Sequence, residues 1–313
     1  MDIITVVVTY NRKELLTECL NSLLSQTFEV KKIIIIDNAS TDGTYELLND
    51  SGYLQNSKID YNQMETNLGG AGGFYEGIKL ADKEQADWIW IMDDDSIPDS
   101  DCLKELTGQA YKMPNTSFFA SCVYGPEGEP MNVPEVDMRP HQNGYPYWYE
   151  KLNEGIVKIC TATFVSLLIN NGAVKKCGLP CKKYFIWGDD SEYTKRLTKY
   201  FGDAYLVGTS RVCHKRINAK SLEISNESNP ARIRNYFYMI RNNLVNSIIY
   251  DTKGRALKNF IKYIIIAIKC LFSENHRFSK FNVIMHGLIC ALAEQKKFRD
   301  YIMSQISEEH IVE

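Results

Sequence analysis

Three consecutive aspartates at positions 93–95 directly follow the hydrophobic segment 88–92. Their negative charges repel one another, and a divalent cation would neutralise them, because Mg²⁺ and Mn²⁺ prefer oxygen ligands and also bridge substrate phosphates. If the extended backbone continues, Asp93 and Asp95 point to one side and Asp94 to the other. An acidic surface turn is the alternative, but the position directly after a buried strand favours a metal site.

A second acidic pair, Asp189 and Asp190, precedes Tyr193, Leu197 and Tyr200, which recur at helical spacing. We therefore expect the pair at or just before the N-terminus of a helix. The helix dipole favours a carboxylate there, which by itself accounts for one capping aspartate. Two in succession indicate a further role, because a carboxylate within hydrogen-bond reach of a hydroxyl can act as its general base.

His214 follows the strand-like segment 204–207. A lone histidine is usually structural or lies on the surface. If it completed an aspartate-rich site, its imidazole would favour Mn²⁺ over Mg²⁺.

A glycine-rich turn at residues 67–74 runs into a predicted helix. Backbone amides in such a turn can approach a phosphate or a sugar closely, because glycine has no Cβ. The segment does not have the spacing of a dinucleotide-binding or P-loop motif, so neither of these is predicted.

The elements that must hold these residues alternate between strand and helix. Continuous apolar runs predict buried strands at residues 3–9, 32–37 and, as the third, 88–92. Helices are predicted after a capping-box-like start at Asn11, over about 43–49, and around residues 74–81 and 103–110. Such alternation implies a mostly parallel sheet, whose ligands bind beyond the carboxyl ends of the strands. The polar clusters 9–12, 37–40 and 93–95 are all predicted at that edge.

The length and composition fit one large α/β domain with a smaller appendage. The chain has 313 residues, of which 44% are hydrophobic and 24% charged, as in ordinary globular proteins. The first residues resemble a buried strand and not a signal peptide. The nine cysteines are interpreted as reduced structural thiols of a cytosolic protein, with a zinc site at Cys177 and Cys181 as the alternative.

The net charge of −3 conceals a basic C-terminal block. Residues 253–299 contain ten Lys and Arg against two Glu. This block coincides with the apolar segment 257–272, whose longest uninterrupted apolar run, 263–268, is far shorter than the ~20 residues of a membrane-spanning helix. Two compatible interpretations remain: a helix lying on an anionic membrane surface, or helices packed on the main domain or on a second subunit. The basic residues accompany long apolar runs, so nucleic-acid binding is not predicted.

Four motifs, in this order, resemble glycosyltransferase family 2, a family of inverting enzymes with the GT-A fold. They are Thr9-Tyr10-Asn11-Arg12, Asp37-Asn38-Ala39-Ser40, Asp93-Asp94-Asp95 and Trp187-Gly188-Asp189-Asp190. The resemblance covers about residues 3–216. The glycine-rich turn combined with the aspartate triplet and the later histidine looks most like galactofuranosyltransferases, and rhamnosyltransferases share much of this pattern.

The resemblance implies a role for each matching residue. The nucleotide and donor sugar would be bound by Thr9, Asn11, Arg12, Asp37, Asn67, Gly69, Gly70, Asp93 and Asp94. Asp95 and His214 would ligate Mn²⁺ or Mg²⁺, with Asp93 facing both the ribose and the metal. Asp190 would be the catalytic base beside Asp189. Trp187 would form a wall for the acceptor, although Gly188 separates it from the aspartate pair, unlike in related sequences.

The resulting prediction is a GT-A α/β catalytic domain at residues 1–216, Rossmann-like with a mostly parallel sheet, and a C-terminal helical region at 217–313. In that region, residues 236–242 resemble a motif that packs a helix under the active site. Proline and aromatic residues at 124–158 predict a long functional loop, followed by a strand at about 160–169. The exposed aromatic side chains of this loop suit stacking on sugar rings. The alternative is that the loop folds onto its own aromatic side chains.

The predicted reaction is metal-dependent transfer of galactofuranose from UDP-galactofuranose to a polyprenyl-linked glycan in bacterial polysaccharide synthesis. Transfer of rhamnose from dTDP-rhamnose, a non-catalytic sugar-nucleotide-binding protein and a nucleotidyltransferase are the alternatives. The expected location is the cytoplasm, with peripheral attachment to the inner face of the plasma membrane, and a homo-oligomer is compatible with the pattern.

Overall fold

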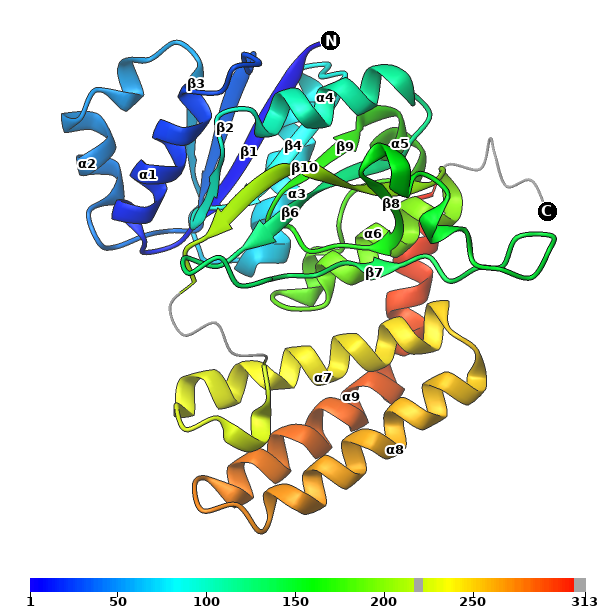
Figure 1. The fold of residues 1–313 in the computed structure, drawn as a ribbon. Helices are drawn as coiled ribbons and strands as arrows, with labels where there is room; N and C mark the ends of the chain where they lie inside the picture. Colours follow the sequence, from blue (N-terminus) through cyan, green and yellow to red (C-terminus); the bar gives the residue numbers. More distant parts are fainter. Residues whose placement is uncertain (217–221, 307–313) are drawn as a thin grey trace.

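A sheet flanked by helices forms the first part of the chain, and three long helices lie against one end of it (Figure 1). The computed structural model describes residues 1–216 and 222–306. The predicted domain boundary after residue 216 therefore coincides with the start of the gap between these two ranges. It stays a prediction, although all the described residues after this gap are helical or in short connections.

The sheet has ten strands in the order β3-β2-β1-β4-β9-β6-β10-β8-β7, with β5 paired to β10. The strands are β1 (Ile3–Thr9), β2 (Lys32–Asp37), β3 (Ile59–Gln63), β4 (Trp88–Asp93), β5 (Ser96–Pro98), β6 (Phe118–Tyr124), β7 (Glu135–Val136), β8 (Ile156–Thr161), β9 (Leu167–Asn170) and β10 (Ala204–His214). Strands β3, β2, β1 and β4 are parallel, and β6 is parallel to β10, which confirms the parallel core of the predicted sheet. Antiparallel β9 joins the two parallel parts.

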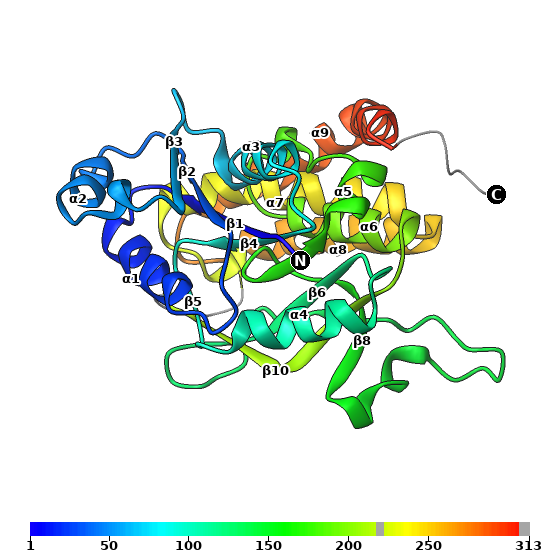
Figure 2. The ribbon, with the colours of Figure 1, turned by 90° about the horizontal axis from the view of Figure 1, so that it is seen from above.

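Helices cover both faces of this sheet (Figure 2). They are α1 (Lys13–Leu24), α2 (Thr44–Asp50), α3 (Gly69–Lys83), α4 (Cys102–Lys112), α5 (Asn171–Cys177) and α6 (Asp189–Tyr200). Alternate residues of β1 explain the two layers: Ile3 and Val7 pack in the core under α1 and α4, whereas Ile4 and Val6 pack under α3. Because both faces are buried, the strand reads as a continuous apolar run.

Two local predictions were wrong, and one strand was not predicted. Strand 88–92 is the third buried strand, as predicted, but the fourth strand in the chain, because β3 is a half-exposed edge strand whose polar sequence carries no apolar run. The strand predicted at 160–169 is two strands, β8 and β9, which occupy different positions in the sheet. Asn11 does not cap α1: the helix begins at Lys13, and the Asn11 side chain accepts a hydrogen bond from the Thr41 amide.

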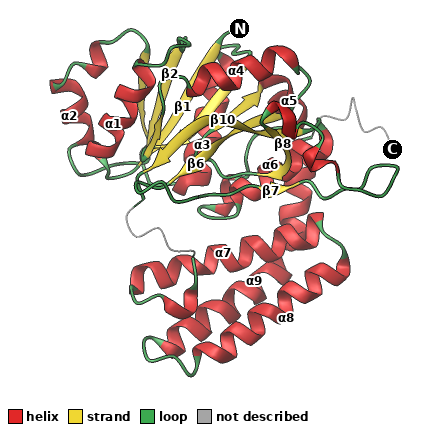
Figure 3. Ribbon diagram, viewed as in Figure 1, coloured by secondary structure: helices red, strands yellow, loops and turns green. Residues whose placement is uncertain are grey.

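The described C-terminal residues, 222–306, form α7 (Pro230–Tyr250), α8 (Lys253–Cys270) and α9 (Arg277–Ser304) with a short 3-10 turn at Ile224–Asn226, and Figure 3 shows helices and loops but no strand among them. Their apolar core extends to Ala71 of α3 and to Tyr184, so the helices pack on the part of the chain that contains the sheet, as one of the two interpretations predicted. The Tyr184 hydroxyl donates to Asn246 Oδ1 at 2.6 Å. Within the described ranges, no helix is both long and apolar enough to cross a membrane.

All nine cysteines lie in the described ranges and are free thiols. Burial raises the pKa of Cys177 to about 11 and that of Cys181 to about 12, which disfavours the thiolate that a zinc site needs. The preferred interpretation as structural thiols fits these surroundings.

Candidate active site

Strand pairing brings Asp93, Asp95 and His214 into one cluster. Each offers a ligand atom, and these atoms all lie within 4.8 Å of one another. The antiparallel pairing of β5 with β10 places His214 opposite Ser96, next to Asp95, and the Lys215 amide donates to the Asp95 carbonyl at 2.8 Å. It is the single group of this kind in the part of the chain that the structure describes.

The surroundings of the imidazole prepare His214 to ligate a cation. Its Nδ1 lies 2.9 Å from Asn132 Oδ1, which can only accept, so Nδ1 carries the proton and Nε2 is free to bind a metal. Nε2 lies 3.1 Å from Asp95 Oδ1, a buried oxygen that makes no hydrogen bond of good geometry with any described residue. Two facing lone pairs at this distance fit a cation between them. Asn132 comes from the long loop, and no sequence motif identified it.

The electrostatics also favour a cation. Burial, together with the charges of Asp95 and Asp94, raises the pKa of Asp93 well above its ordinary value. The only cationic group that contacts the triplet among the described residues is Arg12, whose Nη1 lies 2.7 Å from Asp95 Oδ2 and 3.2 Å from Asp94 Oδ1. One guanidinium, which is half exposed, does not neutralise three carboxylates. The cluster therefore has the donor set and the excess charge that a divalent cation requires.

Asp94 lies outside the group of possible metal ligands, but the condition for the predicted alternation is not met, because β4 ends at Asp93 and residues 94–95 form a turn. Asp94 Oδ2 accepts a hydrogen bond from the Thr9 hydroxyl at 2.7 Å, and burial raises the pKa of Asp94 to about 6. Asp94 therefore connects the ends of β1 and β4. Its predicted contact with substrate stays a prediction.

The predicted nucleotide-binding residues lie at one edge of the sheet, as expected. Parallel register places Thr9 opposite Asp37 and Val8 opposite Asp93. The Asp37 carboxylate is fully buried. It accepts one hydrogen bond from the Ser40 amide at 2.7 Å and a second from the Tyr61 hydroxyl. It orders the turn after β2, and its binding of the nucleotide remains to be tested.

The glycine-rich segment forms the first turns of α3. Gly69 has φ +71°, and a Cβ there would lie 2.1 Å from the Phe185 carbonyl oxygen, so only glycine permits this approach. Deeper in the helix, a Cβ at Gly77 would lie 2.2 Å from Val6 Cγ1. Nothing lies within 4 Å of a Cβ at Gly70, which faces open space. Asn67 Oδ1 accepts a hydrogen bond from the Gly69 amide at 2.8 Å. These glycines let α3 approach the sheet and the loop that precedes Asp189.

The loop that precedes Asp189 has a strained backbone, and hydrogen bonds from a side chain of α7 hold it in place. Phe185, Trp187 and Gly188 have φ values of +67°, +60° and +87°. The fully buried amide of Asn242 donates to the carbonyls of Tyr184 at 3.0 Å, Ile186 at 3.2 Å and Trp187 at 2.6 Å. Non-glycine residues keep such conformations only when their surroundings fix them. The prediction that residues 236–242 pack a helix under the site is confirmed.

Asp189 and Asp190 begin α6, as predicted, with Gly188 as the N-cap. Burial and the charge of Asp190 raise the pKa of Asp189 to about 8, and burial also raises the pKa of Asp190. The charge of Asp189 in turn contributes to the raised pKa of Asp93. The two acidic clusters, far apart in sequence, thus belong to one electrostatic site, and a cation at the first would favour the ionised form of the second.

Replacing Asn242 with leucine should destabilise the protein and disturb the Asp189 loop, because the carbonyls of Tyr184, Ile186 and Trp187 would each lose a hydrogen bond. We expect a loss of about 1–3 kcal/mol in the free energy of unfolding. Below the unfolding temperature, kcat should fall while the affinity for nucleotide changes little. Asn235→Leu on the same helix is the control, because that amide makes no hydrogen bond with the described residues. Equal effects of the two changes would contradict the role of Asn242.

Comparison with known proteins gives consistent matches. The model of the family described as glycosyl transferase family 2 matches residues 4–177. Galactofuranosyltransferase GlfT1 of Mycobacterium tuberculosis is 28% identical over 207 residues, which are 63% of this chain and 64% of that protein. GlfT1 of Mycolicibacterium smegmatis is 38% identical over 107 residues, 34% of each chain. Abequosyltransferase RfbV of Salmonella typhimurium is 40% identical over 100 residues, 31% of this chain and 29% of that one. The matches thus span less than two thirds of each relative.

Solved structures share the fold at low sequence identity. GalNAc-T7 with UDP, GalNAc and Mn²⁺ aligns with a TM-score of 0.64 at 14% identity, over 97% of this chain and 57% of that one. The Staphylococcus aureus TarS fragment 1–349 with UDP-GlcNAc aligns with a TM-score of 0.55 at 15% identity, over 97% and 88%. These likenesses confirm the predicted GT-A fold.

Proposed function

Because this chain belongs to glycosyl transferase family 2, we propose that it transfers galactofuranose from UDP-galactofuranose to a lipid-linked glycan, with inversion, in bacterial polysaccharide synthesis. The observation that carries the proposal is the cluster of Asp93, Asp95 and His214 beside the Asp189–Asp190 pair. A cation site next to a buried carboxylate pair provides the two functions that a single displacement needs.

Asp93, Asp95 and His214 would hold the cation, with Mn²⁺ favoured over Mg²⁺ because one ligand is an imidazole. When bound, such a cation stabilises the charge that develops on the leaving diphosphate. Thr9, Asn11, Arg12, Asp37 and Asp94 line the strand edge where we place the nucleotide. Asn67, Gly69 and Gly70 lie at the start of α3, where the donor sugar would approach the open space at Gly70.

The proposed chemistry is one in-line displacement. Asp190 accepts the proton of the acceptor hydroxyl, whose oxygen forms a bond to the anomeric carbon as the bond from that carbon to the diphosphate breaks. The oxygen attacks from the face opposite the diphosphate, so an α-linked donor yields a β-linked product. Asp189 contacts donor or acceptor, and Trp187, whose ring packs 5.3 Å from that of Tyr236, forms the acceptor wall.

A donor panel tests the function. UDP-galactofuranose, UDP-galactopyranose and dTDP-rhamnose are each supplied with Mn²⁺ and a polyprenyl-diphosphate-linked glycan, and the released nucleotide and glycosylated product are measured. We expect turnover with UDP-galactofuranose. Turnover with dTDP-rhamnose alone would replace the proposed donor with rhamnose, and binding of nucleotide sugars without any transfer would support a non-catalytic binding protein.

We place the membrane contact, from the cytoplasmic side, on α8. Large apolar side chains that are 47–85% exposed recur along this helix and just beyond its end, at Leu257, Ile261, Ile265, Ile268 and, in the following turn, Phe272. Lysines accompany them at positions 258, 262 and 269. An apolar stripe bordered by cations is complementary to anionic lipid, and a surface-bound enzyme would meet a lipid-linked acceptor there.

The double change Ile261→Asp and Ile265→Asp should reduce binding to phosphatidylglycerol vesicles at least tenfold in co-sedimentation, whereas phosphatidylcholine vesicles should bind the unchanged protein weakly. Tyr111→Asp, at a side chain that is 60% exposed on α4, is the matched control. If the stripe is instead a subunit interface, the unchanged protein will be a homo-oligomer, the double variant will be monomeric, and neither will bind vesicles. That outcome would overturn the membrane contact.

A further inference from the structure

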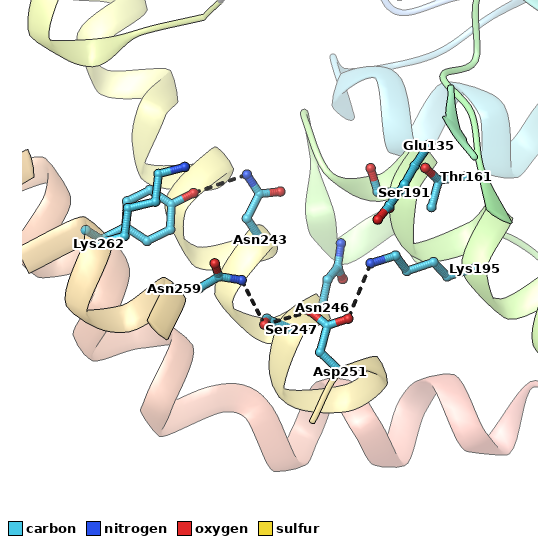
Figure 4. Close-up of a pocket in the computed structure, with 11 residues that line it drawn as sticks. Glu135, Thr161, Ser191, Lys195, Asn243, Asn246, Ser247, Asp251, Asn259 and Lys262 are labelled. Carbon is cyan, nitrogen blue, oxygen red and sulfur yellow. Dashed lines mark hydrogen bonds and ion pairs between the residues drawn. The ribbon is translucent and has the colours of Figure 1, made fainter. Parts of the chain in front are cut away.

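A polar cavity of about 240 Å³ lies between the catalytic part and the C-terminal helices, beside the Asp189–Asp190 pair. Figure 4 shows Glu135, Thr161, Ser191 and Lys195 on one side of it and residues of α7 and α8 on the other. The helices thus contribute a wall of this cavity in addition to supporting the fold. Neither the family motifs nor the metal cluster includes any of these residues.

We propose that this cavity, hereafter the interdomain pocket, binds one uncharged sugar ring of the acceptor glycan. The inference rests on the proposed transferase function and specifies where the acceptor glycan binds. It identifies Asn243 and Asn259 as residues that determine which acceptor is used.

The position of the interdomain pocket supports this assignment. Ser191 lines it and directly follows Asp190, and the Asp190 carboxylate accepts a hydrogen bond from the Ser191 amide at 2.6 Å. Asn246 also lines the pocket, and its amide donates to the Gly188 carbonyl at 2.8 Å, at the end of the strained loop. A sugar ring in the pocket would therefore contact Ser191, which directly follows the residue proposed to deprotonate an acceptor hydroxyl.

The charges around the interdomain pocket favour an uncharged ligand. Two acids, Glu135 and Asp251, are matched by two bases, Lys195 and Lys262, and Lys195 Nζ lies 3.7 Å from Asp251 Oδ1. With no net charge on its lining, the pocket has no excess of cations for the diphosphate of a lipid carrier. The hydrophobic tail of such a carrier is also excluded, because the lining is mostly amide, hydroxyl and charged groups.

The amides present the hydrogen-bonding groups that a sugar requires. Asn259 Nδ2 donates to Ser247 Oγ at 3.0 Å, and Ser247 donates to Asp251 at 2.8 Å, so this row is fixed in orientation (Figure 4). Asn243 Nδ2 donates to the Tyr263 hydroxyl at 3.2 Å. The Oδ1 atoms of both amides make no hydrogen bond with the described residues and are available as acceptors for ligand hydroxyls. The volume, below the ~300 Å³ of pockets that enclose drug-sized ligands, suits one ring and not an oligosaccharide.

The experiment measures binding of methyl glycosides to the full chain in the presence of saturating UDP and diamagnetic Mg²⁺, by saturation-transfer NMR. The probes are methyl galactopyranoside, methyl glucopyranoside and methyl rhamnopyranoside, and inorganic phosphate, whose binding is measured by calorimetry, is the anionic contrast. Asn243→Ala and Asn259→Ala are compared with Asn282→Ala, an exposed asparagine on α9. UDP binding is measured in every variant by calorimetry, and KM for the acceptor is measured with the donor-panel assay.

We expect at least one glycoside to bind the unchanged protein. Each pocket variant should weaken this binding and raise KM for the acceptor at least tenfold, with UDP binding and the Asn282→Ala variant unaffected. The proposal is overturned if no glycoside binds, if phosphate binds in their place, or if the pocket variants match the control. Absence of UDP binding in the unchanged protein is a different result, because it would reject the transferase function itself.

Discussion

Replacing Asp190 with asparagine should lower kcat by roughly 10²- to 10⁴-fold, the usual contribution of a positioned general base. The asparagine occupies the same space and still accepts the hydrogen bond from the Ser191 amide, so folding and UDP binding should be preserved. The measurement is single-turnover transfer from UDP-galactofuranose, together with calorimetric titration of UDP in the presence of Mn²⁺.

The neighbouring change Asp189→Asn is the control that assigns the base. Because burial raises the pKa of Asp190, activity of the unchanged enzyme should fall on acidification at a pH above the ordinary aspartate pKa of about 3.9, as the carboxylate takes up a proton. That acid limb should be absent from the residual activity of Asp190→Asn. Turnover that is unchanged in Asp190→Asn but lost in Asp189→Asn would transfer the role of base to Asp189.

Replacing Asp95 with alanine should abolish metal-dependent activity, because it removes the buried carboxylate that faces His214. Loss of a residue that only orients a metal ligand typically costs 10- to 100-fold in affinity, so loss of the ligand should exceed about 100-fold. Calorimetry of Mn²⁺ in the presence of UDP measures this change. In the unchanged protein, EDTA should stop transfer, and Mn²⁺ should restore it more effectively than Mg²⁺.

One further variant and a melting measurement separate metal binding from folding. Asn132→Ala removes only the partner of His214 Nδ1, so its Mn²⁺ affinity should fall by about 10- to 100-fold, less than in Asp95→Ala. Despite burial, His214 and Arg12 lower the pKa of Asp95, so its ionised carboxylate stabilises the metal-free fold at neutral pH, and Asp95→Ala should lower Tm. Mn²⁺ affinity is therefore compared at a temperature well below the Tm of the variant. Mn²⁺ affinity that is unchanged in Asp95→Ala would remove this residue from the metal site.

Local patterns were sufficient for the parts of the site that lie at the ends of buried strands. The apolar runs of β1, β2 and β4 predicted strands covered on both faces, and parallel strands place Thr9, Asp37 and Asp93 at one edge whatever the rest of the chain does. The two-residue period of an extended chain did not apply to Asp94 and Asp95, because these residues form a turn after β4. Helical spacing after Asp190 was enough to place the acidic pair at the start of α6.

Local patterns failed where an element is short, polar or at an edge. Strand β3 shows no apolar run, because one side of it is unpaired and half exposed. The segment after the long loop has the composition of one strand, yet β8 pairs with β10 while β9 inserts between β4 and β6. A continuous apolar pattern records burial, but it does not record which neighbour each residue pairs with.

By itself, then, the sequence determined the family, the α/β order and the residue types of both acidic clusters, because these depend on periodicity and on motifs read within a few residues. Only the tertiary structure decided that β5 pairs with β10 and brings His214 to Asp95, that Asn132 orients the imidazole, and that Asn242 holds the Trp187 loop. The interdomain pocket belongs to the same group, since its walls come from two parts of the chain. Such contacts depend on strand register and on the docking of α7 and α8, which join residues that no short-range pattern connects.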